Sequence, residues 1–184
     1  VTCLTYPKDN MSNAPTFTAQ LPEPLYTSQQ VRENEPKAAA QCDTSMFELM
    51  QRAGQAVFDL LIQQYPDATH ILVCCGKGNN GGDGYIVASL AIQAGLTVSL
   101  WQTGDANDLK GDAQQAMQHY LKQGGVISEP SDELPAHVDV IIDGLLGTGI
   151  QGEVRPQFAD VISLLNQAAT PIIAIDTPSG LHTD

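Results

Sequence analysis

Basic residues are scarce in this sequence. Only 8 Lys and Arg stand against 21 Asp and Glu in 184 residues, so the formal net charge is −13. A field of this sign repels phosphate backbones and anionic lipid headgroups. We therefore expect neither a nucleic-acid partner nor a membrane-surface partner.

Cysteines and long apolar runs are also few. None of the four cysteines has a Cys-x-x-Cys or paired metal-ligand spacing, and Cys74-Cys75 lie in an apolar run, where reduced thiols pack as small hydrophobes. No stretch approaches the roughly 20 apolar residues of a membrane span, and the N-terminus lacks the basic-then-apolar pattern of a signal peptide. These absences favour a soluble, cytoplasmic protein.

Residues 1–26 differ from the rest of the chain. They contain four prolines and no sustained hydrophobic period, which predicts a tail or arm rather than part of a core. Residues 27–184 have the length of one domain, which typically takes roughly 100 to 200 residues. They open with a helical pattern over 27–41, in which Pro36 should kink the helix or start a second one.

From Ser45 onward, helical patterns alternate with short apolar runs. A capping-box sequence, Ser45 to Glu48, predicts a helix that ends at Tyr65-Pro66. Apolar runs without a polar face are typical of strands buried on both sides. Their alternation with helices predicts an α/β fold, with a doubly wound, mostly parallel sheet and helices on both faces. We expect strands at 71–75, 97–101, 126–127 (weak), 138–142 and 172–175, helices that end at Gly95 and Gly124, and a helix that begins at Pro156.

Three unusual segments follow predicted strands. In an open parallel sheet, ligands bind at the carboxyl ends of the strands, so these segments are the candidates for a site. They are GKGNNGGD at 76–83, DGLLGTGIQGEVR at 143–155 and DTPSG at 176–180. Neither G-x-S-x-G nor G-x-x-x-x-G-K-[ST] occurs, which disfavours a serine hydrolase and a P-loop NTPase.

The first segment fits the dinucleotide-binding pattern G-x-G-x-x-G, and Asp105 lies near the end of the next strand, where a ribose-binding acid could sit. On this pattern alone, an ordinary NAD site and a structural tight turn both stay open. The sequence Asn-Asn-Gly-Gly at 79–82 is poor in helix formers, and Asp83 would be a natural N-cap for a helix starting at Gly84. We therefore expect a loop longer than a Rossmann turn, with free N–H groups and two carboxamides facing a ligand.

The other two segments each begin with an aspartate after an apolar run. Beyond Asp143, the glycines of 147–152 let backbone N–H groups form an anion-binding nest, with Lys77 and Arg155 as further phosphate holders; a plain glycine-rich connection is the alternative. Asp176 begins either an Asx-type turn or part of a site. Carboxylates at neighbouring strand ends are costly unless each meets a donor, a cation or a ligand. The available oxygen ligands suit a weakly held cation, whereas no His or Cys cluster suggests zinc or iron.

Together, NNGGDG, D-x-L-L-G-T-G and D-x-P-S-G resemble the motifs of the NAD(P)HX epimerase family, also called the YjeF N-terminal domain family. The resemblance covers roughly Thr27 to the end of the chain, including the helix ELMQRAG at 48–54. It implies a Rossmann-like, three-layer α/β/α fold and an isomerase that interconverts the R and S epimers of hydrated NADH or NADPH. This is nucleotide repair, because a fused or separate ADP/ATP-dependent dehydratase accepts only one epimer. A homo-oligomer is also implied.

The resemblance implies roles for individual residues. Potassium would be the cofactor, with Asn80, Asp143 and Ser179 as its ligands. As a hypothesis, Asp143 is catalytic: it protonates the hydroxyl next to the ring nitrogen of the substrate, so that water leaves and can return from either face. The implied substrate-binding residues are Asn79, Asn80, Gly81, Gly82, Asp83, Gly147, Thr148, Gly149, Ile150, Gln151, Gly152, Glu153 and Asp176.

Two features depart from the family. Pro36 interrupts a region that is usually a smooth helix, and the sequence stops at Asp184, whereas family members run on through further strands and some are fused to the dehydratase. We therefore expect the domain at 27–184 to lack its last strands and any C-terminal dehydratase domain. Two alternatives stay open: a non-catalytic dimerising or nucleotide-binding scaffold of the same fold, as in mRNA-decapping factors, and a conventional NAD-dependent oxidoreductase.

Overall fold

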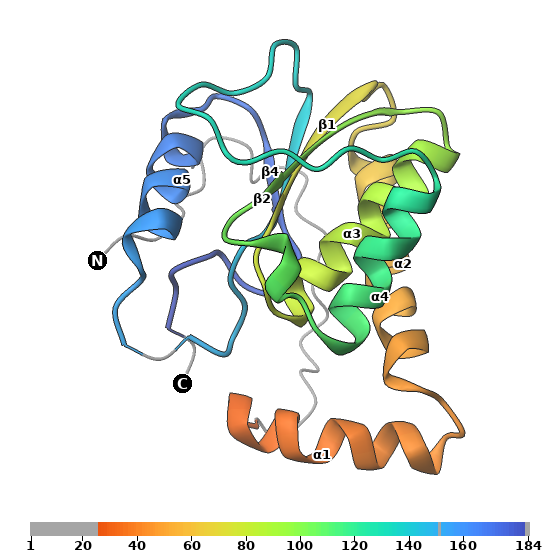
Figure 1. Cartoon of the computed structure of the whole chain (residues 1–184). Coiled ribbons are helices and arrows are strands. Elements are labelled where there is room, and N and C mark those ends of the chain that lie inside the picture. Colours follow the sequence, from red (N-terminus) through yellow and green to blue (C-terminus); the bar gives the residue numbers. More distant parts are fainter. Residues whose placement is uncertain (1–25, 151, 183–184) are drawn as a thin grey trace.

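The structure is a computed structural model that describes residues 26–150 and 152–182 (Figure 1). Of the predicted tail, only Tyr26 lies within this range. The elements, in chain order, are α1 (Ser28–Gln41), α2 (Met46–Gln64), β1 (His70–Cys75), α3 (Asn79–Gln93), β2 (Thr97–Gln102), the 3₁₀ helix η2 (Ala106–Asp108), α4 (Gly111–Lys122), β3 (Val140–Gly144), α5 (Pro156–Gln167) and β4 (Ile172–Ala174).

The four strands form one parallel sheet in the order β2-β1-β3-β4. This confirms the predicted α/β fold. The weak strand expected at 126–127 is wrong: instead, Ser128 makes a single parallel bridge to Trp101 of β2. Val126 leaves 69% of its surface exposed, so it contributes no apolar face that would hold a longer strand against β2.

Helices cover both faces of the sheet, as Figure 1 shows, with α2, α3 and α4 on one side and α5 on the other. Alternate side chains of β1 pack into the two hydrophobic cores, one on each face of the sheet. Ile71 and Val73 belong to the core shared with α2, α3 and α4, whereas Leu72 and Cys74 belong to the core shared with α5. All four side chains are fully buried. The absence of a polar face in this strand therefore follows from burial on both sides.

The first two helices both begin with capping boxes. In α2, the Ser45 N–H donates to Glu48 Oε2 at 2.7 Å and the Glu48 N–H donates to Ser45 Oγ at 3.1 Å, which confirms the predicted start. Helix α1 runs without a break through Pro36, so no second helix begins there. Proline leaves the carbonyl four residues earlier without its helical partner. That carbonyl belongs to Arg32, an exposed residue where water can replace the lost donor.

Within the described ranges, no helix combines the length and apolar character that crossing a membrane requires. Cys74 and Cys75 are buried free thiols, which confirms their packing as small hydrophobes.

Candidate functional site

The three unusual segments meet at the carboxyl edge of the sheet. The Gly76 N–H donates to the Gly144 carbonyl at 3.0 Å, which joins the first segment to the second. A Cβ added to Gly147 would lie 2.6 Å from Asp176 Oδ2 and 3.5 Å from Asn80 Cγ. Residues from all three predicted segments are therefore neighbours.

The first segment is mostly helix rather than loop. Helix α3 begins at Asn79, with Gly78 as its N-cap, so the predicted start at Gly84 with Asp83 as N-cap is wrong, as is the predicted long loop. A Cβ on Gly81 would overlap the backbone carbonyl oxygen of Gly76, and one on Gly82 would lie 2.6 Å from Met50 Cε. The two glycines let the first turn of α3 pack closely, and this tertiary packing overrides their low helix propensity. The free N–H groups are those of a helix N-terminus, a favourable place for an anion.

Asp143 is fully buried in β3 and fully hydrogen-bonded. Its Oδ1 accepts from Ser179 Oγ at 2.6 Å and from the Leu145 N–H at 3.2 Å, and its Oδ2 accepts from the Ser179 N–H at 2.9 Å. Loss of solvent raises the pKa of Asp143 above its ordinary value, although the hydrogen bonds from Ser179 and Leu145 act in the opposite direction. The site thus holds a carboxyl group whose protonated form is favoured by burial.

Ser179 connects Asp143 to the loop after β3. Its hydroxyl accepts from the Leu146 N–H at 2.9 Å and lies 3.1 Å from the Leu146 carbonyl oxygen. Because a hydroxyl has one proton, Ser179 donates either to Asp143 or to this carbonyl. If Asp143 is protonated, it can donate to Ser179, which then donates to Leu146. The pair therefore accommodates both protonation states without leaving an unpaired donor.

At this edge the side chain of Asn80 lacks a hydrogen-bond partner within the described residues, as do the hydroxyls of Thr103 and Thr177. Both the Oδ1 and the Nδ2 of Asn80 are buried, and neither has a hydrogen bond within the described part of the chain. Buried amides are rarely left in this state, so the geometry favours a ligand at this position. The described residues include no group of three or more His, Cys, Asp or Glu that could hold a metal. Any ion here would be bound by mixed oxygen ligands, and Asn80, Asp143 and Ser179 supply such oxygens.

A second group of acids lies one turn into α3. Burial, followed by the charges of Asp176 and Glu35, raises the pKa of Asp83 to about 7. Asp176 is exposed, and its Oδ2 accepts from the Thr148 N–H at 2.8 Å. Glu35 belongs to α1, which the sequence could not place, so its contribution was missed. The signal for Asp83 itself was present in NNGGDG, but the sequence suggested a cap rather than a titrating acid.

The rest of the second segment, from Gly149 to Glu153, makes few contacts with other elements among the described residues. Arg32 of α1 lies over Gly149, since a Cβ there would be 3.0 Å from its Nη2. Gly152 has a φ of +75°, which favours glycine. Ile150 is half-buried and Glu153 is exposed. Gln151 lies outside the described residues.

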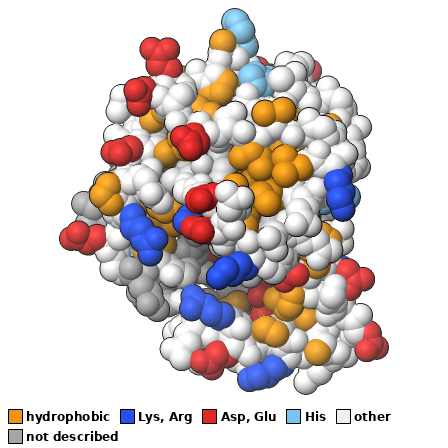
Figure 2. Space-filling model, viewed as in Figure 1, with side chains coloured by type: hydrophobic (Ala, Val, Ile, Leu, Met, Phe, Trp, Pro, Cys, Tyr) orange, Lys and Arg blue, Asp and Glu red, His pale blue; other side chains and the backbone are white. Residues whose placement is uncertain are grey.

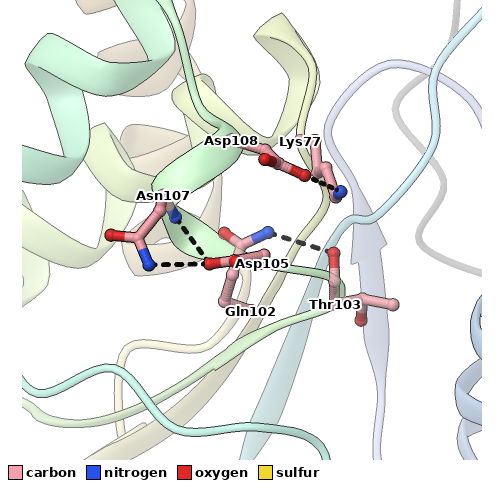
Figure 3. Close-up of polar contacts among 6 residues, drawn as sticks. All are labelled: Lys77, Gln102, Thr103, Asp105, Asn107 and Asp108. Atoms are coloured by element: carbon pink, nitrogen blue, oxygen red, sulfur yellow. Dashed lines mark hydrogen bonds and ion pairs between the residues drawn. The ribbon is translucent and has the colours of Figure 1, made fainter.

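The two predicted phosphate holders are placed differently. Lys77 Nζ donates to Asp108 Oδ2 at 2.5 Å, so its charge is paired at the end of η2, beside β2 (Figure 3). Arg155 is exposed at the N-cap position of α5. Several of the Lys and Arg side chains visible in Figure 2 lie in the lower half of that face, toward α1 and the carboxyl ends of the strands, among more widely spread acidic ones.

The chain is similar in sequence to proteins of known name, and similar in fold to a solved structure. The chain is 49% identical over 164 residues to the bifunctional NAD(P)H-hydrate repair enzyme Nnr of Vibrio cholerae, which covers 89% of this chain and 33% of that protein. It is 32% identical over 166 residues to the NAD(P)H-hydrate epimerase of Legionella pneumophila (strain Corby), which covers 86% of this chain and 62% of that protein. The chain thus spans about a third of the length of the first relative.

A crystal structure of yeast ynu0 has the same fold. It matches with a TM-score of 0.73 at 20% sequence identity, over 85% of this chain and 71% of the yeast chain. The family model described as YjeF-related protein N-terminus matches residues 46–184, which include all three segments of the site. The chain belongs to the family of YjeF-related N-terminal domains.

Proposed function

We propose that this chain is an isomerase that repairs nicotinamide nucleotides by interconverting the R and S epimers of hydrated NADH and NADPH. The relatives that it resembles are named NAD(P)H-hydrate epimerase and bifunctional NAD(P)H-hydrate repair enzyme. The observation that carries the proposal is the buried, hydrogen-bonded carboxyl of Asp143 beside the N-terminus of α3, where the side chain of Asn80 has no partner.

The reaction needs an acid that gives a proton to the leaving hydroxyl and takes a proton back from the water that adds. In the proposed mechanism, Asp143 gives its proton to the hydroxyl on the carbon next to the ring nitrogen, and that hydroxyl departs as water. The nitrogen lone pair stabilises the cation that remains. A water molecule then adds from either face and returns a proton to the carboxylate, so the sum of atoms and charge is unchanged. A raised pKa favours this role, because the acid must be protonated before the reaction begins.

Asp83 is the competing proton donor. Its pKa is raised to about 7, and it is less deeply buried than Asp143. We assign the proton transfer to Asp143 because Ser179 and Leu145 hold its position with three hydrogen bonds. Asp83 and Asp176 then contact the substrate, as do the N–H groups of α3 and the 147–153 segment.

Potassium is the cofactor that we propose. Asn80, Asp143 and Ser179 would hold it through the free amide oxygen, a carboxyl oxygen and the hydroxyl. Bound there, the ion would supply a fixed positive charge that offsets the carboxylates around the substrate. Removing the side-chain oxygen of Asn80 should therefore weaken the dependence of the melting temperature on potassium.

The biological setting is part of the proposal. We propose a cytoplasmic homo-oligomer that acts with an ADP/ATP-dependent dehydratase, which consumes the S epimer; this agrees with the word bifunctional in the name of the Vibrio cholerae relative. A scaffold of the same fold and an NAD-dependent oxidoreductase are the competing functions. The combined presence of Asn80, Asp143, Asp176 and Ser179 favours the epimerase.

A coupled assay tests the function. The chain is added to R-NADHX with an excess of S-specific dehydratase, its nucleotide and potassium, and the formation of NADH is followed. We expect NADH to form faster than the spontaneous epimerisation measured without the chain. A rate equal to the spontaneous one would support the scaffold, and reduction or oxidation of unhydrated nucleotide with a second substrate would support the oxidoreductase.

A further inference from the structure

A cleft lies on the other side of β1 from the Asp143 site. It has a volume of about 1010 Å³ and lies at the end of β2, between the segment 127–132 and one side of α5. Its wall includes Gln102, Thr103, Gly104 and Asp105, which leave β2 at the same carboxyl edge as the site. None of the residues assigned to the substrate or to potassium lines this cleft.

The turn before α3 separates the cleft from the Asp143 site. A Cβ on Gly104 would overlap Lys77 Cε and would lie 3.4 Å from Gln157 Nε2 of the cleft wall. Lys77 therefore forms the border, where Asp108 holds its ammonium (Figure 3). Neighbouring strands are about 4.8 Å apart, so the ends of β2 and β3 are separated by about 10 Å, with β1 between them. Two nucleosides joined by a diphosphate can span this distance, with the diphosphate at the N-terminus of α3.

Two side chains of the cleft have unused hydrogen-bonding capacity. Thr103 is only 2% exposed, and its Oγ1 has no partner within the described residues. Asp105 Oδ1 accepts from both the N–H and the side-chain amide of Asn107, each at 2.9 Å, which fixes the carboxylate (Figure 3). Its Oδ2 has no donor in the described part of the chain. A carboxylate after the second strand, with one free oxygen, is suited to accept a hydrogen bond from a ribose hydroxyl.

The negative charge of the cleft favours a ribose with a free 2′-hydroxyl over one with a 2′-phosphate. Its lining includes four acids and no Lys or Arg among the residues that the structure describes; the acids are Asp105, Glu129, Asp132 and Asp160. A phosphate monoester adds roughly −1.5 to −2 charges at neutral pH. A 2′-phosphate would therefore be repelled, whereas a 2′-hydroxyl would find an acceptor.

We propose that this cleft binds the adenosine half of the hydrated dinucleotide, and that Asp105 makes NADHX a better substrate than NADPHX. The inference rests on the proposed function for the identity of the other half of the ligand. Asp105 is here a specificity-determining residue, because it contacts the ribose and not the reacting carbon.

The kinetic test compares both substrates in the coupled assay. For the wild-type chain we expect kcat/KM to be about tenfold or more higher for NADHX than for NADPHX, given the charge of the cleft. Asp105→Asn keeps an acceptor for Asn107 and removes the charge, so the ratio should fall toward one. Asp67→Asn makes the same charge change in an exposed turn at the opposite edge of the sheet and should leave the ratio unchanged.

A binding test separates this inference from the proposed function. ADP-ribose and its 2′-phosphate derivative are titrated calorimetrically into the wild-type chain and both variants. Tighter binding of ADP-ribose by the wild-type chain, lost in Asp105→Asn and kept in Asp67→Asn, supports the cleft even if the chain epimerises nothing. Equal affinity for the two probes, or an equal loss of discrimination in both variants, overturns the cleft assignment and leaves the epimerase proposal intact.

Discussion

The two ends of β3 each carry an aspartate that accepts three hydrogen bonds, and their pKa values move in opposite directions. Asp139 precedes the strand and accepts from the Thr69 N–H, the Thr69 hydroxyl and the His70 N–H, all at its Oδ2. Those bonds hold its pKa below the ordinary value. Asp143 lies one residue before the end of the strand and accepts hydrogen bonds from Ser179 and Leu145, yet its pKa is raised.

The difference between the two aspartates is the solvent. Asp139 is exposed, so its charge costs little and the hydrogen bonds decide the direction of the pKa shift. Asp143 has no exposed surface, and the cost of burying its charge is larger than the stabilisation of that charge by the hydrogen-bond donors. Asp139 is thus a structural carboxylate that joins β3 to β1. Asp143 is kept in a state that favours a proton, which is the property that catalysis by an acid needs.

The largest expected effect comes from a substitution that would open the carboxyl edge of the sheet to water, and so reduce the difference in solvent exposure between Asp143 and Asp139. Gly81→Ala would push its Cβ into the carbonyl oxygen of Gly76 and force α3 away from the sheet. Overpacking against backbone should cost about 3 kcal/mol or more of unfolding free energy. Gly78→Ala adds the same methyl where nothing lies within 4 Å, and should cost about 1 kcal/mol or less. Urea unfolding of both variants measures this, and equal losses would contradict the close packing of α3.

The pH dependence of stability should have opposite signs at the two edges. The pKa of Asp83 in the folded chain is about 7, above its unfolded value of about 4. The contribution of Asp83 to the free energy of unfolding is therefore fully present below pH about 4, and it is lost as the pH rises to about 7. Asp83→Asn removes that loss. Allowing for its remaining contact with solvent, we expect the variant to be about 2 kcal/mol more stable than the wild-type chain near pH 8, and equal near pH 4. Thermal unfolding at both pH values checks this, and a variant less stable near pH 8 would show that the carboxylate is stabilising.

Asp139→Asn should give the smallest change, with the reverse pH profile. Because the pKa of Asp139 is lowered on folding, its contribution is present above the unfolded pKa of about 4 and is lost as the pH falls through the lower, folded value. The variant should therefore be slightly less stable than the wild-type chain near neutral pH, and the difference should disappear in acid. A difference that grows in acid would contradict the role of Asp139 as a hydrogen-bonded carboxylate.

The sequence predicted the parts of the fold that depend on local patterns. The apolar run at 71–75 and the capping box at Ser45 needed no tertiary information, and both are confirmed. The start of α3 was predicted five residues too late, because glycines that disfavour an isolated helix are required where α3 packs against Gly76 and Met50. Helix propensity cannot show this, since the partners come from other elements.

The candidate site was predictable only as a set of strand ends. Parallel pairing of β1, β3 and β4 brings Asn80, Asp143 and Asp176 to one edge, as their positions after apolar runs had suggested. Two other features depend on distant contacts. Glu35 reaches the acids of the site only through the path of α1, and the cleft at Asp105 exists only because α5 and the segment 127–132 form its other walls.

The most direct measurement compares epimerase kcat for Asp143→Asn and Asp139→Asn in the coupled assay with R-NADHX. Asparagine at 143 can keep the bonds with Ser179 but has no proton to transfer, so kcat should fall by roughly a hundredfold or more, while substrate still binds. Asp139→Asn should stay within about twofold of the wild-type rate, because its carboxylate only joins strands. Unchanged turnover in Asp143→Asn, or a loss of the same size in both folded variants, would contradict the assignment of the proton to the buried end of β3.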